Sequence, residues 1–344
     1  DLSAFATSYL EVFSRGYNMA FGIAAIAMII SLVVYIVFNK LLPSKQFVHK
    51  DASGTGAVKM SWDEEKRRLG ALGLVFIVVI FFWMSFHQNG LTLTMFARDY
   101  TVKQVDSFTN IFFYLPSMLS FLGAVAGLVM LLNRKAGLTV KVVGAGMLLV
   151  GGGLTYYFSS GFSAMNDIQP EIFQSFNPLF IVALTFLVLG FFGWLNKRGQ
   201  EPSTPKKIGI GMIIASLGFI IVLTGSLSLL SPHDLNGAPV PEDMRISPYW
   251  LISSYLVLTI AELFLSPMGL SFVSKVAPPR FQGLMQGGWL GATAIGNKLL
   301  FVGSFLWDRI DLWQLWAIFV VCCLLSAAFI FSILKRLERV TKGA

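Results

Sequence analysis

Three ionisable residues lie deep inside apolar stretches of this sequence, and their types and positions are suited to chemistry within a membrane. Glu262 is near the middle of the apolar run Tyr249–Lys275, and His87 and Lys298 lie within apolar runs of their own. A charged side chain at the centre of a bilayer is costly, so it usually marks a route for a substrate or a proton. These residues therefore predict a transporter.

Four polar side chains fall at similar depths when residues are counted from the predicted helix ends. At about 1.5 Å per residue, the heights of Glu262 and Lys298 differ by only roughly 3 Å. Their helices are consecutive and antiparallel, so we expect an ion pair between them. The same count places His87 and Asn177 in this layer. Three alternatives stay open: a static buried pair for Glu262, snorkelling of Lys298 to a membrane edge, and a simple hydrogen bond for His87.

Two polar patterns accompany these groups. Ser266 lies one turn from Glu262 on the same helix face. Pro267 removes a backbone hydrogen bond there, which predicts a kink that opens backbone carbonyls to a cavity. On an earlier helix, a polar stripe is expected to face other helices or water, and it consists of Ser85, Gln88 and Thr92. His87 lies beside this stripe and is a candidate proton carrier, because histidine changes charge near neutral pH.

A membrane fold is needed to position these residues. Of the 344 residues, 55% are hydrophobic and only 13% are charged, about half the charged fraction of soluble domains. Mostly apolar stretches long enough to span a bilayer recur along the chain, which indicates an all-α polytopic membrane protein and not a β-barrel. We expect nine transmembrane helices: Tyr17–Phe38, Gly70–Ala97, Thr109–Leu132, Leu138–Ser159, Ile172–Leu195, Ile208–Leu230, Tyr249–Lys275, Gly283–Leu306 and Trp313–Leu334.

The net charge of +8 does not indicate a nucleic-acid partner, because the basic residues flank the predicted helices. Most of the 26 Lys and Arg residues fall in alternate loops, beginning with residues 39–69, and in the C-terminal tail. The positive-inside rule makes these segments cytoplasmic. We therefore expect a multi-pass protein of the inner (cytoplasmic) membrane, surrounded by lipid bilayer, with its C-terminus in the cytoplasm.

The sequence argues against an enzyme. His49, His87 and His233 fall in different segments, and no HExxH or clustered Cys/His pattern occurs, so we expect no metal site. No G-x-x-x-x-G-K-[ST] phosphate loop is present either, so ATP is not expected to drive the protein. We expect no cofactor.

The segment Glu262–Gly269 reads Glu-Leu-Phe-Leu-Ser-Pro-Met-Gly and is followed by Lys275–Pro278, Lys-Val-Ala-Pro. These runs resemble the tenth-helix motif and the helix exit of the proton-coupled oligopeptide transporter family, part of the major facilitator superfamily. Further segments resemble the family's seventh, eighth and eleventh helices: Phe82–Gln88 with Phe96-Ala97, Gln174–Ile181, and Trp289 with Gly296-Asn297.

The resemblance implies a major facilitator fold of which this chain is the C-terminal part. Residues 1–38 would be the end of the N-terminal half (family helix six), residues 39–69 a cytoplasmic interdomain loop, and residues 70–344 the six-helix C-terminal half. The family's first-helix motif, Glu-x-x-Glu-Arg, does not occur, so the N-terminal half is expected to be missing from this chain. An inserted helical hairpin, 109–159, falls between family helices seven and eight. We expect this hairpin at the periphery, facing lipid.

The resemblance also implies roles for residues of a substrate site. It assigns Glu262 to the amino terminus of a peptide, Asn177 to the peptide backbone and Trp289 to a side-chain pocket. Ser266 and Gln88 complete the expected substrate-binding residues.

Proton coupling is expected to involve Glu262, His87 and Lys298. His87 departs from the family, because an acidic residue usually precedes the seventh-helix Gln. The leading hypothesis is proton-coupled symport of di- and tripeptides. The alternatives are a facilitator carrier of amino acids, nitrate or drugs, a non-transporting membrane scaffold, and a membrane enzyme, for which no constellation of residues is visible.

Overall fold

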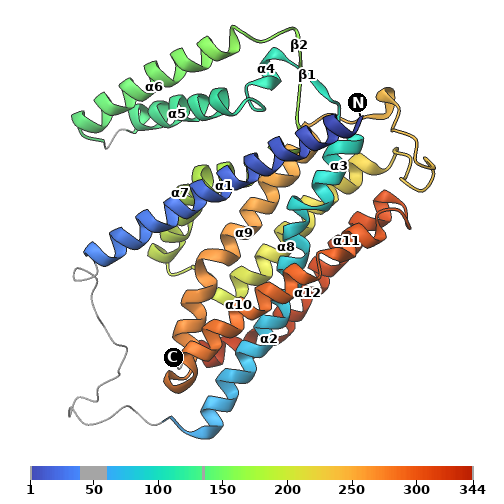
Figure 1. Ribbon diagram of the computed structural model, residues 1–344. Coiled ribbons are helices and arrows are strands. Elements are labelled where there is room, and N and C mark those ends of the chain that lie inside the picture. Colours follow the sequence, from blue (N-terminus) through green and yellow to red (C-terminus); the bar gives the residue numbers. More distant parts are fainter. Residues whose placement is uncertain (1, 39–59, 134–135, 343–344) are drawn as a thin grey trace. The chain divides into compact units, whose positions relative to one another are not determined.

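The computed structural model describes residues 2–38, 60–133 and 136–342. Within these ranges, nine helical segments are long and apolar enough to cross a membrane, which confirms the expected all-α polytopic class (Figure 1). The chain divides into two compact units, residues 1–59 and residues 60–344. Each unit is described by itself.

The first unit is represented by helix α1, Leu2–Phe38. Its apolar span covers Ser14–Phe38. Arg15 lies at the start of this span and pairs with Glu11 one turn earlier, at 2.8 Å. Residues 39–59 of the expected interdomain loop lie outside the described residues, and the assignment of residues 1–38 to family helix six stays a prediction.

The second unit is a helical bundle that carries a small two-stranded ribbon. Its elements are, in order, α2 (Trp62–Phe86), η2 (His87–Gly90), α3 (Thr92–Tyr100), β1 (Gln104–Asp106), α4 (Ser107–Asn110), α5 (Leu115–Leu132), α6 (Leu138–Ser159), β2 (Met165–Asp167), η3 (Pro170–Ser175), α7 (Phe176–Lys197), α8 (Thr204–Ser226), η4 (Glu242–Met244), α9 (Tyr249–Val276), η5 (Pro279–Phe281), α10 (Gln282–Lys298), α11 (Phe301–Leu306) and α12 (Leu312–Lys342).

Helix α2 begins at Trp62, earlier than the expected start at Gly70, so the last part of the predicted loop is helical. The first turn is acidic, which suits the positive end of the helix dipole. Glu64 in this turn pairs at 2.8 Å with Arg68, whose side chain is almost fully buried.

Two helices that we expected to be continuous are interrupted, and the two breaks touch. The predicted helix 70–97 is divided at η2, and Leu91 has non-helical angles, φ −125° and ψ −81°. The predicted helix 283–306 is divided between Lys298 and Phe301. Gln88 joins the breaks by donating to the Leu300 carbonyl at 3.3 Å. Helix α9 is assigned as one helix through Pro267, and the kink expected there stays a prediction.

The core of the bundle lies where α8 packs against α9 and α12, while α2 packs against α10 and α12 (Figure 1). Phe219 of α8 stacks on Phe319 of α12 with a ring-centroid distance of 5.3 Å. Gly218 permits the close approach of α9, because a Cβ at this position would lie 2.9 Å from the Leu258 side chain. Aromatic packing and a small residue at the contact are typical of helices that associate within a membrane.

The expected hairpin consists of α5 and α6, with a short ribbon, β1 and β2, at its base. Helices α5 and α6 pack on each other through glycines, and a Cβ on Gly127 would lie 2.5 Å from the Gly144 carbonyl. At the base of the hairpin, β1 pairs with β2 in antiparallel register, with Val105 opposite Asn166. The ribbon brings the two ends of the hairpin together. The assignment of the hairpin as an insertion between family helices and the hairpin's expected contact with lipid both stay predictions.

Candidate functional site

The centre of the candidate site is a hydrogen-bonded pair, Glu262 of α9 and Asn177 of α7. Asn177 Nδ2 donates to Glu262 Oε2 at 3.0 Å and to Thr259 Oγ1 at 3.0 Å. Thr259 is fully buried, and its hydroxyl donates to the Tyr255 carbonyl at 2.7 Å. Thr259 and Glu262 are three residues apart and so lie on one face of α9. That face holds the Asn177 amide in a fixed orientation.

The pair keeps two hydrogen-bond acceptors available. Within the part of the chain that the structure describes, no donor contacts Glu262 Oε1 or Asn177 Oδ1. Both side chains are half-buried. Carboxylate and amide oxygens each accept more than one hydrogen bond, whereas a primary ammonium group only donates. The site can therefore receive a ligand that brings a cationic donor.

Further polar contacts connect this site to the break between α2 and α3. The Tyr255 hydroxyl donates to the Asn89 carbonyl. Gln174, just before α7, donates through Nε2 to Thr94 Oγ1 at 3.1 Å and to the Gly90 carbonyl at 3.5 Å. These contacts attach three segments to one another: the α2–α3 break, α9 and the segment that leads into α7.

His87 occupies the first position of η2 and faces α10 instead of Glu262. Its Nδ1 is hydrogen-bonded to Asn297 Oδ1, and its ring stacks on Trp83 with a centroid distance of 4.7 Å. With the Asn297 amide oxygen placed toward the ring, Nδ1 is assigned as the donor, because an amide oxygen only accepts. No partner of Nε2 is recorded among residues 60–133 and 136–342, so this nitrogen can bind a proton.

Gln88 is fully buried and all its hydrogen-bonding groups are engaged. Its Nε2 donates to the carbonyls of Met84 at 3.1 Å and Leu300 at 3.3 Å, and its Oε1 accepts from the Thr92 hydroxyl. Gly303 lies directly over this group, because a Cβ there would collide with Gln88 Oε1. The hydrogen bonds of Gln88 therefore connect two helix breaks. For Gln88 to bind a substrate, it would have to give up at least one of these hydrogen bonds.

Trp289 is buried between α9 and α2, with only 4% of its surface exposed. Its ring lies against Gly269, where an added Cβ would overlap the indole. On its other side it meets Phe76 edge-on, with a centroid distance of 6.3 Å. The position expected to line a side-chain pocket is thus filled by helix packing. Ser266, another expected ligand, is exposed on α9 one turn beyond Glu262.

Lys298 does not form the expected ion pair with Glu262. It is the exposed last residue of α10, and none of the ion pairs among the described residues includes either side chain. The residue count compared the heights of Glu262 and Lys298 along their helices, but it did not consider which side of each helix they lie on. Trp289, Ala292 and Gly296 are the buried residues of α10. Lys298 points roughly 180° away from Trp289 at 3.6 residues per turn, so it faces away from α9.

Three residues of this network were not expected from the sequence: Thr259, Tyr255 and, as a partner of His87, Asn297. Thr259 and Tyr255 carried a usable signal, because both fall on the helix face of Glu262 at spacings of three and seven residues. Asn297 was noted only within the family resemblance, and nothing in the sequence indicated its contact with His87, because the two residues lie on helices far apart in the sequence.

Comparison with known proteins shows which families and structures this chain is similar to. Residues 159–311 match the model of the POT family. The chain is 26% identical over 322 residues to the peptide transporter YePEPT of Yersinia enterocolitica, covering 92% of this chain and 48% of that protein. It is 24% identical over 318 residues to a dipeptide and tripeptide permease B of Xenorhabdus bovienii, covering 86% of this chain and 56% of the permease. The chain thus spans about half the length of these curated relatives.

A crystal structure of a peptide transporter POT has the same fold. It superimposes with a TM-score of 0.53 at 21% sequence identity, over 92% of this chain and 53% of that one. The partial coverage of the relatives fits the expected correspondence to a C-terminal part of the major facilitator fold.

Proposed function

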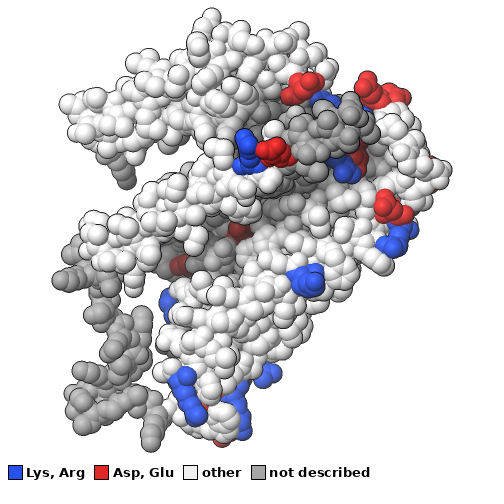
Figure 2. Space-filling view, viewed as in Figure 1, with Lys and Arg blue, Asp and Glu red and all other residues white. Residues whose placement is uncertain are grey.

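We propose that this chain, whose residues 159–311 match the POT family, forms the C-terminal part of a proton-coupled symporter of di- and tripeptides. The transporter lies in the cytoplasmic membrane with the C-terminus of this chain in the cytoplasm. On the face drawn in Figure 2, Lys and Arg gather at the end of the bundle where α2 begins. This distribution supports the orientation that the positive-inside rule predicts.

The observation that carries the proposal is the unused acceptor capacity of Glu262 and Asn177. A peptide has a cationic amino terminus that only donates hydrogen bonds. Glu262 Oε1 and Asn177 Oδ1 together offer a charged and a neutral acceptor to such a group. Charge-assisted hydrogen bonds are the stronger kind, particularly away from bulk water. We assign the peptide ammonium to this pair.

Similarity to named transporters supports the choice of substrate. Two relatives are named as a peptide transporter and as a dipeptide and tripeptide permease. A structure with the same fold is described as a POT family transporter in complex with 5-aminolevulinic acid, which also carries an amino group. A primary amine is the chemical group that these ligands share.

The proposed transporter contains a second half that completes the substrate site. Carriers of this type bind substrate between two pseudosymmetric halves near the middle of the membrane. Residues 1–38 would then end the N-terminal half, residues 70–344 would supply the six helices of the C-terminal half, and the inserted hairpin would lie at the lipid boundary.

Protons drive the proposed transport through Glu262 and His87. Protonation of Glu262 would release a bound ammonium by removing the opposite charge. His87 supplies a second site, since its Nε2 has no recorded partner among the described residues. The role of Lys298 in proton coupling stays a prediction. In this conformation Lys298 forms no ion pair with Glu262, so such a role would not depend on a direct contact between them.

The test is uptake of a labelled dipeptide by vesicles that contain the intact transporter, with and without an inward proton gradient. The proposal predicts accumulation that requires the gradient and is inhibited by unlabelled di- and tripeptides. Uptake that ignores the gradient contradicts the coupling, and transport that dipeptides fail to inhibit indicates a carrier of amino acids, nitrate or drugs. A scaffold would show no transport and would tolerate Glu262→Gln in cells.

A further inference from the structure

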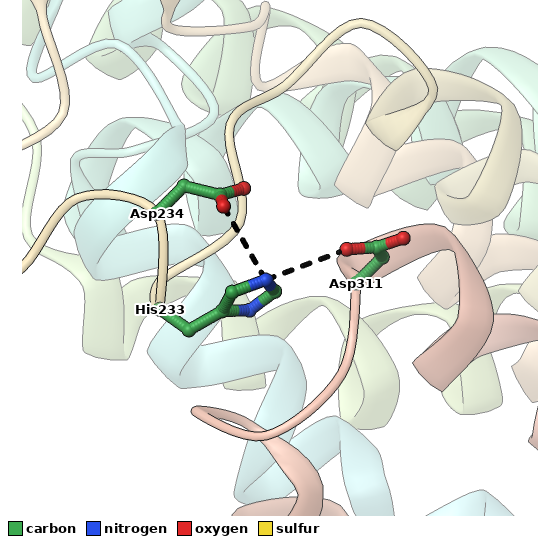
Figure 3. A group of neighbouring side chains, drawn as sticks. All are labelled: His233, Asp234 and Asp311. Atoms are coloured by element: carbon green, nitrogen blue, oxygen red, sulfur yellow. Dashed lines mark ion pairs between the residues drawn. The ribbon is translucent and has the colours of Figure 1, made fainter.

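A second group of polar side chains lies outside the candidate site, at the loop ends of α8 and α12. His233 and Asp234 belong to the loop between α8 and α9, and Asp311 directly precedes α12. One ligand atom from each residue lies within 4.8 Å of the others. His233 Nε2 is 3.4 Å from Asp234 Oδ1 and 3.6 Å from Asp311 Oδ1, so the two carboxylates converge on the same ring nitrogen (Figure 3).

These distances suit ligands of a common ion better than direct hydrogen bonds. An N–H···O hydrogen bond usually measures about 2.7–3.2 Å. A tetrahedral zinc ion with bonds of about 2.1 Å holds its ligand atoms roughly 3.4 Å apart. An imidazole nitrogen with carboxylate oxygens is also a zinc-type ligand set, whereas calcium and magnesium take oxygen ligands.

The cluster is held in place by contacts between the loop and α12. The Ser231 backbone N–H donates to Asp234 Oδ2 at 3.2 Å, which leaves Oδ1 directed at His233. The Leu312 backbone N–H donates to the Ser231 hydroxyl at 3.1 Å. Hydrogen bonds of this kind to a ligating carboxylate fix its orientation in metal sites.

An adjoining cavity provides an independent observation. It has a volume of about 680 Å³ and is lined by His233, Tyr100 and Asp308, among other residues. Tyr100 is 1% exposed, and its hydroxyl has no hydrogen-bond partner among the described residues. A buried hydroxyl without a partner calls for an explanation, and a bound water or ion near the cavity would supply one. Water bound to an ion at His233 would occupy this cavity.

We propose that His233, Asp234 and Asp311 bind one zinc-type divalent cation, with water completing its coordination. The ion fastens the α8–α9 loop to the beginning of α12. No metal-binding pattern in the sequence marks this site, because its ligands come from two distant segments. The site is separate from the proposed peptide site and does not depend on it.

The experiment titrates zinc chloride into the intact purified protein by calorimetry, after the affinity tag has been removed and the protein treated with a chelator. His233→Asn and Asp311→Asn each remove a ligand. Asp308→Asn is the matched control, because it removes a carboxylate that lines the same cavity but lies outside the cluster. We expect one zinc ion per chain in the wild type and the control, and affinity weakened by about tenfold or more in the two ligand variants.

Thermal unfolding and cobalt substitution provide two further readouts. Zinc should raise the melting temperature of the wild type and of Asp308→Asn but not of the ligand variants, whose helix content without metal should equal that of the wild type. Cobalt(II) should give the visible spectrum of a tetrahedral complex. If the wild type shows no saturable binding, the cluster is a histidine–carboxylate ion pair and the proposal is wrong. Equal binding by the ligand variants also overturns it, because the ion then binds elsewhere.

Discussion

Two polar groups lie inside the same helical bundle, and they differ in how much of their hydrogen-bonding capacity is used. Gln88 gives both donors to the carbonyls of Met84 and Leu300 and accepts from Thr92. Glu262 and Asn177 bond to each other and yet keep one oxygen each without a donor from the described residues. The hydrogen-bonding capacity of Gln88 is fully used, whereas Glu262 and Asn177 can still accept hydrogen bonds from a ligand.

The difference shows that polarity inside a membrane protein does not by itself indicate binding. A buried polar group without partners is costly, so every such group must be satisfied by protein, water or a ligand. Gln88 is satisfied by protein, and its hydrogen bonds join two helix breaks. Glu262 is satisfied only in part, and the remaining capacity is what we assign to a peptide ammonium.

The largest effect is expected from Glu262→Gln, which keeps the shape of the side chain and removes its charge. Hydrogen bonds to charged groups contribute about 1.5–3 kcal/mol, so dipeptide affinity should fall by roughly 10- to 150-fold and uptake should nearly disappear. Uptake by whole cells, normalised to surface expression, measures this effect. Expression should be unchanged, and transport at the wild-type rate would rule out the assigned role.

Gln88→Leu should instead act on stability. The substitution removes two donated hydrogen bonds and leaves the buried Thr92 hydroxyl without an acceptor, and each unsatisfied buried group costs about 1–3 kcal/mol. We expect a lower melting temperature in detergent and less protein at the membrane, with an unchanged KM for dipeptide in the transporter that remains. A raised KM with normal stability would show that Gln88 binds substrate. Gln88 would then not differ in function from the pair Glu262 and Asn177.

His87→Gln should separate accumulation from exchange. Glutamine can still donate a hydrogen bond to Asn297, but it cannot take up a proton. Gradient-driven accumulation of dipeptide should therefore be lost, while exchange down a concentration gradient continues. The assay compares the two modes in the same vesicles. Accumulation that survives the substitution would move the coupled proton to Glu262 or to the N-terminal half.

Lys298→Met should have the smallest effect. Lys298 is exposed at the end of α10 and belongs to none of the ion pairs among the described residues. Substitutions at such positions usually change free energies by less than about 0.5 kcal/mol, so dipeptide accumulation should change by less than about twofold. Accumulation assays at several external pH values measure this. A loss comparable to that of His87→Gln would show that Lys298 acts in coupling through another conformation.

The fold was predictable from hydropathy, because the need to bury every backbone polar group leaves few solutions within a membrane. The helix breaks at His87–Gly90 and Leu299–Leu300 were not predicted. Asn89-Gly90 is a turn signal within the first break, but hydropathy stays high across both segments, and the contact between the two breaks depends on how the helices pack. Glu262 was predicted as a site residue from its depth in an apolar run and from a motif, and Asn177 from its depth and the family resemblance. Their contact requires knowing which face of α7 meets α9, and the motif does not contain that information.

The predicted ion pair between Glu262 and Lys298 was wrong for a related reason. Counting residues gives height along a helix, but a contact also depends on the angle around it. Thr259 shows the opposite case, because its spacing from Glu262 gives both height and angle on the same helix. Spacing within one helix is therefore a safer guide than matching heights between two.

Recognition of the peptide amino terminus by Glu262 can be tested with a ligand that lacks the ammonium group. The measurement is the affinity of the intact transporter for a dipeptide and for the same dipeptide with an acetylated amino group, in the wild type and in Glu262→Gln. We predict that the wild type prefers the free amine by about tenfold or more, and that the variant binds both ligands equally weakly. If the variant keeps the wild-type preference, another residue recognises the amino terminus and the assignment of Glu262 is wrong.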